Sequence, residues 1–398
     1  MSGAAAGMGE GAWVVLPAAQ RADGSWIDDT LARRSVEAGV TDRAPDAGRF
    51  PRQRVELFRA ADAGAVVDEA FRRRGWTDGL PVVAPTTGRV AALVRASARR
   101  AEEVVGTLAP LGGQATVERI AANAVMAGCG AEQFPYVLAA VDAVCDPSFN
   151  LAGVQTTDEN VAPLVVISAP LARRREAMLH SGCGVLGPGW RGNATIGRAL
   201  RLVLQNLGGG WPAAVSLAGA GQAGRSALVV VEDDDACPWE PLRVTRGFSP
   251  DDAVVVVGRA ETAVNVTGGL AEVVSVMASA TSAFTALHGG SAALLLAPHT
   301  AAALAAGGSS RADVAARLAA EAVIPAERWR SWWVAGAVRS VSHPGDVPVL
   351  AAPDRLLVVV AGATVPIAQH VWFPGWGFPP AHVARRVEPV GGAIGWRR

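Results

Sequence analysis

Lysine is absent from this 398-residue chain: all 36 of its basic side chains are arginine, and they balance 36 acidic ones. Without lysine there can be no Schiff base with pyridoxal phosphate and no phosphate-binding lysine of a P-loop. A formal net charge of zero argues against a general nucleic-acid binder, which carries a basic excess. The composition therefore removes two catalytic mechanisms and one class of partner, and we expect no cofactor.

Cysteine and long apolar runs are also scarce. The four cysteines, Cys129, Cys145, Cys183 and Cys237, form no CxxC pair and fit no zinc framework, so we expect no metal site. Every apolar run ends before ~18 residues, which excludes a transmembrane helix. The opening stretch lacks the charged start and long apolar core of a signal peptide. These features predict a cytoplasmic protein with reduced thiols and no membrane contact.

Short apolar strands alternate with helices along the chain, a pattern typical of α/β proteins. We expect two α/β lobes with mostly parallel or mixed sheets and a cleft between them. Residues 1–52 are predicted to be a poorly ordered extension with one short strand at "AWVVLP". The first lobe is expected over 53–245, and the second over 246–398 with a Trp- and Pro-rich tail.

A faint internal repeat accompanies this pattern. "APLVVISAPLA" and "AALLLAPHTA" each follow an Ala-rich helix and each place Ala-Pro directly after a buried strand. Two interpretations stay open: the two halves are related, or Ala-rich sequences imitate one another. Separately, residues 55–75 have apolar residues at helical spacing and end at Gly75, which predicts a helix.

The segment "HSGCGVLGPGWRGNATIGRALRLVLQN", residues 180–206, combines a thiol, a glycine-rich turn and a helix start. Asn193 or Thr195 is predicted to cap the helix. A helix N-terminus offers unpaired amides and about half a positive charge, and small glycines let an anion approach. A capped helix without a ligand is the plain alternative. The predicted carboxylate or phosphate site comprises Gly187, Gly189, Arg191, Asn193, Thr195 and Arg198.

Candidate reactive groups lie in and around this segment. Cys183 sits among small residues that leave a thiol accessible, and a helix dipole or an arginine favours the thiolate. Cys129, at a helix end beside glycine, is the second candidate nucleophile. Either cysteine could equally be a small buried hydrophobe.

Four further residues are candidates for moving protons. His288 and His299 lie where a helix or a strand ends, and an imidazole titrates near neutrality. Asp78 in "WTDGLP" and Glu118 in "VERIAANAV" are the leading carboxylates, although Asp78 could simply cap its own turn. The acidic run Glu232–Asp235 is either a solvated turn or a divalent-cation site, and the first is far more common.

Four stretches together resemble a large, mostly uncharacterised bacterial family whose members accompany small UGSC-type, selenoprotein-like proteins. They are "GWTDGLPVVAPT" (75–86), "ANAVMAGC" (122–129), "GPGWRGNATIGRALRLVLQNLGG" (187–209) and "PWEPLRVTRGF" (238–248). The resemblance covers roughly residues 55–362. It implies no settled reaction, cofactor or catalytic residue, but its association with thiol or selenol proteins favours sulfur chemistry.

The chain also departs from that family pattern. Arg311 replaces a lysine in "GGSSRADV", Gly192 replaces an alanine, and the last strand ends in Ala361-Gly362-Ala363. Such changes indicate either a divergent branch with a specialised substrate or lost activity.

Two functions follow. The first is an enzyme of bacterial secondary metabolism that acts on a small anionic metabolite by thiol-dependent lyase or oxidoreductase chemistry. The second is a non-catalytic subunit that binds a small thiol or selenol protein through the tail "HVWFPGWGFPPAHV". A homodimer is compatible with either function.

Overall fold

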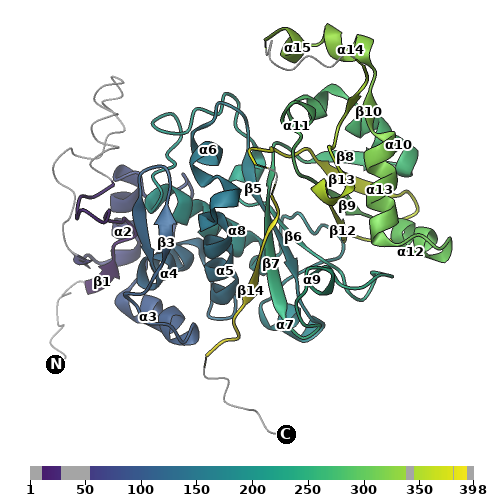
Figure 1. The fold of residues 1–398 in the computed structure, drawn as a ribbon. Coiled ribbons are helices and arrows are strands. Elements are labelled where there is room, and N and C mark those ends of the chain that lie inside the picture. Colours follow the sequence, from purple (N-terminus) through teal and green to yellow (C-terminus); the bar gives the residue numbers. More distant parts are fainter. Residues whose placement is uncertain (1–10, 28–53, 338–344, 380, 392–398) are drawn as a thin grey trace, which may run out of the picture. The chain divides into compact units, whose positions relative to one another are not determined.

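The computed structural model describes residues 11–27, 54–337, 345–379 and 381–391 of the chain. Helices alternate with mixed sheets of parallel and antiparallel strands, so the protein has an α/β fold (Figure 1). Parts of the predicted N-terminal extension, residues 1–10 and 28–53, lie outside the described residues. Within residues 11–27, Gly11–Val15 form a strand, as expected for "AWVVLP", and Val14 and Ile27 are fully buried.

The chain divides into two compact units, and the division does not follow the predicted boundary at residue 245. Unit 1 contains residues 1–141, 195–217 and 388–398, and unit 2 contains 142–194 and 218–387. Each unit is therefore built from separated stretches of sequence. Local periodicity cannot reveal such a division, because it depends on which distant segments pack together.

Unit 1 joins two antiparallel strand pairs to helices. The expected helix over 55–75 begins late: Val55–Arg59 is a strand, and the helix starts after Asp62, whose side chain accepts a hydrogen bond from the Ala65 amide. The elements are β1 (Gly11–Val15), β2 (Val55–Arg59), α2 (Ala63–Arg73), α3 (Thr87–Ala96), β3 (Val104–Leu108), β4 (Gly113–Thr116), α4 (Val117–Ala127), α5 (Phe134–Cys145) and α8 (Arg191–Asn206), of which the last two extend past the division.

Unit 2 contains two four-stranded mixed sheets. Sheet I has the order β14-β7-β5-β6 and sheet II the order β8-β13-β9-β12. The strands of sheet I are β5 (Ala162–Ser168), β6 (Val229–Val231), β7 (Ala253–Ala260) and β14 (Val383–Val387). Those of sheet II are β8 (Val264–Thr267), β9 (Ala292–Leu296), β12 (Leu356–Val360) and β13 (Gln369–Phe373).

Short helices connect these strands. They are α6 (Leu151–Thr156), α7 (Leu171–Glu176), α9 (Leu242–Thr245), α10 (Leu270–Met277), α11 (Ala283–His288), α12 (Pro298–Ala306), α13 (Arg311–Glu321), α14 (Ala326–Ser331) and α15 (Trp333–Ala337). A two-stranded pair, β10 (Val323–Ile324) with β11 (Val347–Pro348), completes the unit. No single helix in the described part of the chain is long and apolar enough to cross a membrane, although two bent helix pairs match by length and composition.

The two sheets share one topology. In each, a central strand (β5 or β9) runs parallel to one neighbour (β6 or β12) and antiparallel to the other (β7 or β13). The fourth strands are exchanged: β8 follows β7 but pairs with β13, and β14 follows β13 but pairs with β7. The Ala-Pro repeat in the sequence therefore marks a repeated topology. Both copies lie within unit 2, so they are not the two predicted lobes.

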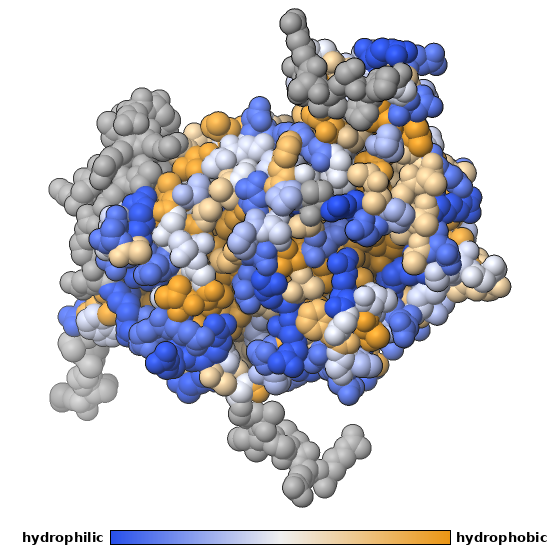
Figure 2. All heavy atoms as spheres, in the orientation of Figure 1, coloured by the Kyte–Doolittle hydropathy of each residue, from blue (hydrophilic) through white to orange (hydrophobic). Residues whose placement is uncertain are grey.

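The core of unit 2 forms between the sheets. Leu164, Val166 and Val256 of sheet I belong to one buried cluster with Leu295 and Val359 of sheet II. Each such side chain stabilises the fold by about 1.5–3 kcal/mol when fully buried. The other face of sheet II packs in a second cluster with residues of α10 and α13. On the face of the molecule drawn in Figure 2, hydrophobic and hydrophilic residues are interspersed.

Candidate functional site

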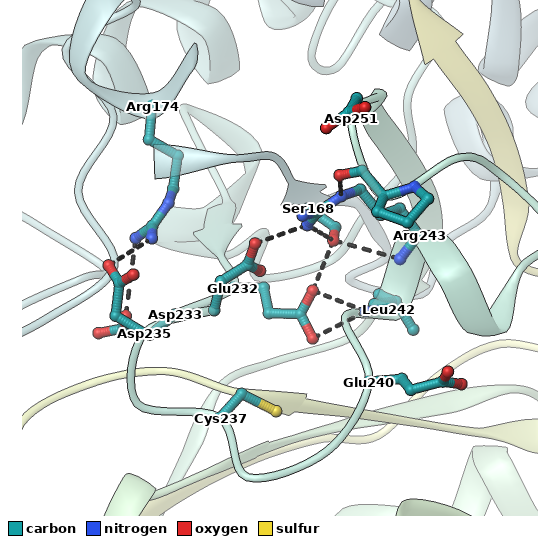
Figure 3. A network of polar contacts seen from close by, with 12 residues as sticks. Ser168, Arg174, Glu232, Asp233, Asp235, Cys237, Glu240, Leu242, Arg243 and Asp251 are labelled. Atoms are coloured by element: carbon teal, nitrogen blue, oxygen red, sulfur yellow. Dashed lines mark hydrogen bonds and ion pairs between the residues drawn. The ribbon is translucent and has the colours of Figure 1, made fainter. Parts of the chain in front are cut away.

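The carboxyl ends of β5 and β6 meet at one edge of sheet I, because the two strands are parallel. Ser168 ends β5, and the acidic run Glu232–Asp235 directly follows β6. Ligands of open α/β sheets bind outside the carboxyl ends of such strands. Figure 3 shows that this edge, which we call the carboxyl edge, carries a network of charged side chains.

Glu232 is the centre of the network. Its carboxylate is completely buried and accepts hydrogen bonds from Ser168 Oγ (2.5 Å), from the Leu242 amide (2.8 Å) and from Arg311 (2.7 Å). A buried carboxylate is tolerated only when such donors compensate its lost hydration. Arg311 also donates to the Val358 carbonyl. The guanidinium thus supplies several donors that a lysine could not direct in the same way.

The remaining acidic side chains of the run are also paired with arginine. Arg174 contacts Asp235 at 2.8 Å and Asp233 at 3.6 Å, and Arg243 contacts Asp234 at 2.7 Å. Burial raises the pKa of Asp234, which the Arg243 hydrogen bond opposes. Arginine partners therefore hold the run in place, and within it Asp235 is the exposed side chain. Among the described residues, no group of acidic, His or Cys side chains is arranged to hold a metal ion.

The loop that carries Cys183 is attached to this edge through Ser181. Arg174 donates to Ser181 Oγ at 2.8 Å, and the Gly362 amide donates to the Ser181 carbonyl at 2.7 Å. Gly362 follows β12, whose last residue, Val360, accepts a hydrogen bond from the Asp233 amide. The exits of β6 and β12 and the Cys183 loop therefore lie together.

Side chains also fix the loop internally. Asn193 accepts from the His180 amide and donates to the His180 and Val185 carbonyls. The His180 ring donates to the Cys183 carbonyl at 2.8 Å and stacks on Trp190, with ring centroids 3.5 Å apart. Gly184, like Gly187 and Gly189, has a positive φ that favours glycine. The loop therefore holds the exposed Cys183 in a defined position.

The predicted anion site keeps fewer donors than expected. Helix α8 begins at Arg191, so Asn193 and Thr195 lie within it rather than at its cap. The Gly192 amide donates to the Met178 carbonyl and the Gly187 amide to the Gly184 carbonyl. Arg191 is exposed beside the helix start. Two of the predicted backbone donors are therefore used within the protein, whereas Arg191 lies at its surface.

Arg198 has a different partner. In unit 1 it forms a two-pronged ion pair with Asp78, with both N–O distances 2.8 Å, and it also donates to the Leu80 and Pro81 carbonyls. Burial raises the pKa of Asp78, but the Arg198 hydrogen bonds and charge lower it further, so the net shift is downward. Gln205 donates to the Gly75 and Thr77 carbonyls of the same loop. The stretches 75–86 and 187–209 therefore contact each other through side-chain hydrogen bonds.

Removing this ion pair has a measurable cost. We expect Asp78→Ala to lower the free energy of unfolding by about 1.5–3 kcal/mol, because the substitution removes charged hydrogen bonds and leaves Arg198 without its carboxylate partner. Urea unfolding measures the change. Glu102→Ala, which removes an exposed carboxylate 3.9 Å from Arg54, is the control and should change it by less than about 0.5 kcal/mol. Equal changes in both variants would contradict a stabilising role of the pair.

The carboxylate Glu118 and the cysteines other than Cys183 are buried or partly buried. Cys129 is buried, and its thiol donates to the Thr195 carbonyl. Glu118 pairs with Arg54 at 3.3 Å, and burial raises its pKa. Burial raises the pKa of Cys145 to about 12 and also raises that of Cys237. Cys183 is the one exposed thiol of the four.

The two candidate histidines lie at opposite ends of helices in unit 2. His299 is the second residue of α12. His288 ends α11, and its Nε2 lies 3.2 Å from Glu159 Oε1. The carboxyl of Glu159 in turn interacts with that of Glu261. Neither glutamate was predicted, and the available signal is weak: one precedes a buried strand and the other follows one.

The Trp- and Pro-rich tail is largely enclosed. His370, Trp372 and Phe373 belong to β13 and are buried, and Trp376 is 5% exposed. Phe378 is the exposed aromatic side chain of this stretch. The tail therefore packs within its own unit. Few of its aromatic side chains remain exposed for the docking surface that we expected.

Comparisons with family models, with curated proteins and with solved structures find no match to this chain.

Proposed function

We propose that the protein is an enzyme whose reacting group is the Cys183 thiol and whose substrate is a small anionic metabolite. One observation carries the proposal: the exposed thiol of the chain lies on a rigidly held loop attached to the carboxyl edge. Loops at that edge of parallel strands are where α/β enzymes place their reacting groups.

The surroundings suit a nucleophile. Helix α8 starts at Arg191, shortly after the loop, and its positive end favours an anionic group beside it. Arg191 adds a guanidinium that can bind a carboxylate or a phosphate in two-pronged fashion. The family resemblance, with its association to thiol and selenol proteins, supports sulfur chemistry. Lyase or thiol-dependent redox chemistry in bacterial secondary metabolism remains the proposed reaction class.

Thiol labelling tests the proposal without knowledge of the substrate. In the native protein we expect one cysteine to react quickly with 5,5′-dithiobis(2-nitrobenzoate), because the other three thiols are partly or fully enclosed. Cys183→Ser should abolish the fast phase and Cys129→Ser should leave it unchanged.

A second measurement addresses the anion. Millimolar succinate or inorganic phosphate should slow the labelling of Cys183, and Arg191→Ala should remove that protection. A labelling rate equal to that of the unfolded chain, or no protection by any small carboxylate or phosphate, would argue against a reacting thiol beside an anion site. Once a substrate is found, Cys183→Ala should abolish turnover while the protein stays folded.

A further inference from the structure

Three titratable side chains meet at the end of sheet I that lies opposite the carboxyl edge. We call Glu159, Glu261 and His288 the acid triad. Ala162 pairs with Ala260 at this end of the sheet, whereas Ser168 pairs with Val254 at the other. Six residues of strand separate the ends, which amounts to roughly 20 Å. The acid triad is therefore distinct from the Cys183 loop and does not depend on the proposed function.

The triad is enclosed. The side chains of His288 and Glu159 are 8% and 14% exposed, and their Nε2 and Oε1 atoms are 3.2 Å apart. Glu159 Oε2 and Glu261 Oε1 are buried and have no hydrogen-bond partner among the described residues. Two neighbouring carboxyls with so few donors cannot both be ionised cheaply, because each charge repels the other in a medium that hydrates neither.

The connections that lead to the exchanged strands β8 and β14 meet at the same place, and we call this meeting point the crossing. The Glu261 amide, just after β7, donates to the carbonyl of Pro374, just after β13, at 2.9 Å. Thr285 of α11 donates to the Gly375 carbonyl at 2.8 Å. A Cβ added at Gly375 would lie 1.5 Å from the Ser291 carbonyl oxygen, so the chain segments are in close contact.

Aromatic rings surround the His288 imidazole, and two of them come from the chain segment that follows β13. Phe378 lies 4.0 Å from His288 between ring centroids, and Trp376 packs edge-on at 6.4 Å. Phe284 of α11 stacks on His288 from within the same helix. The imidazole is therefore held between α11 and the chain after β13, and its one carboxylate contact reaches the segment before β5.

Other charges near the triad are few. Arg259 of β7 is buried, but it donates to the carbonyls of Phe149, Phe378 and Pro379. Asp158, before Glu159, is exposed. The stretch 374–379 contains no titratable side chain, and His288 is the titratable residue of α11. Arg225 also lies near this end of the sheet, where its Nε donates to the Val161 carbonyl at 3.0 Å.

We propose that the acid triad is a proton-controlled latch, which holds the crossing of the exchanged strands closed while one proton stays on the Glu159–Glu261 pair and loosens it when that proton is lost. In the closed state, one carboxylate faces His288 and the protonated carboxyl adds no charge. Loss of the proton leaves two adjacent buried carboxylates. Their repulsion is relieved when α11 and the chain after β13 move away and admit water. Burial and the Glu159 charge both raise the pKa of Glu261, in agreement with a pair that keeps its proton at neutral pH.

Hydrogen exchange at single amides tests the latch. The reporter is the Glu261 amide, which bridges the crossing, and the reference is the Val256 amide in the middle of β7. Protection factors, which already correct for the intrinsic rate, are compared at pH 7.0 and pH 9.5. In the wild type we expect the Glu261 protection factor to fall at least tenfold while that of Val256 changes less than twofold.

Glu261→Gln keeps the shape of the protonated carboxyl and cannot ionise, so its position 261 amide should stay protected at pH 9.5. Glu327→Gln, at an exposed position on α14, is the matched control and should behave as the wild type. Unchanged wild-type protection, a parallel fall at Val256, or an equal fall in Glu261→Gln would each overturn the proposal. If that variant does not fold, Glu159→Gln takes its place with the same expected result.

Discussion

Replacing Glu232 by alanine is expected to lower the free energy of unfolding by about 3–5 kcal/mol, the cost of removing one partner from a buried ion pair. The carboxylate is completely buried and holds three donors from three separate segments. Without it, Arg311 keeps its charge in a site where no solvent replaces the lost partner. The Leu242 amide and the Ser168 hydroxyl lose their acceptor as well, and unsatisfied buried donors add to the cost.

Urea unfolding at pH 7 measures this change. Glu240→Ala is the matched control, because Glu240 is exposed and lies eight residues after Glu232 in the same connection between β6 and α9. It should alter stability by no more than about 0.5 kcal/mol. Glu232→Met combined with Arg311→Met should recover much of the loss, since it removes both charges and fills their volume. A loss below about 1 kcal/mol in Glu232→Ala would show that the carboxylate does not organise the carboxyl edge.

The same variant links the network to the proposed site. The acidic run reaches the Cys183 loop through Arg174 and Ser181. If Glu232→Ala loosens the edge locally, Cys183 should label with altered kinetics at urea concentrations where the chain is still folded. The thiol thus reports on the arrangement that the buried charges maintain.

Much of the fold could be predicted because local patterns determine it. Valine-rich runs such as 162–168 and 253–260 are strands, as their β-branched residues and continuous burial require. The Ala-Pro repeat also had a structural basis, because Pro170 and Pro298 each stand where a central strand passes into a helix. These signals act within ten residues, so a single sequence displays them.

Features that depend on distant segments were missed. Asp78 and Arg198 are 120 residues apart. The sequence predicted a proton-moving or turn-capping role for Asp78 and an anion-binding role for Arg198, but not the ion pair between them. Glu159 and Glu261 are still less conspicuous, since nothing in either local sequence indicates that a second carboxyl lies beside it. The exchange of β8 and β14 leaves no trace in hydrophobic periodicity, because each strand has the same pattern in either sheet.

The exposure of Cys183 could be predicted because its signal is local. Small residues on both sides of a thiol predict exposure, and the glycines with positive φ around it are visible in the sequence. The anchoring of its loop was not visible: Ser181, Asn193 and Trp190 act through contacts that sequence spacing does not specify. The sequence therefore predicted the exposure of the proposed reacting group, while the structure shows which contacts hold its loop.

Protonation of Glu261 should make the stability of the whole chain depend on pH, in a direction opposite to that of most carboxylates. Its pKa in the folded protein lies above the ordinary value near 4.5. Between those two values the folded protein holds a proton that the unfolded chain has released, so stability falls as pH rises. One such group contributes a slope of at most about 1.4 kcal/mol per pH unit. Glu261→Gln removes the slope, because the amide does not titrate.

The measurement is the free energy of unfolding in urea from pH 5 to pH 9 for the wild type and for Glu261→Gln. The two should be similarly stable near pH 5, and the variant should be more stable by at least about 1.4 kcal/mol at pH 8, the equivalent of a single pKa unit. Taking the difference between the curves cancels every other titrating group. A constant difference across this range would mean that Glu261 ionises in the folded protein as it does in the unfolded chain, and that water reaches the carboxyl pair freely.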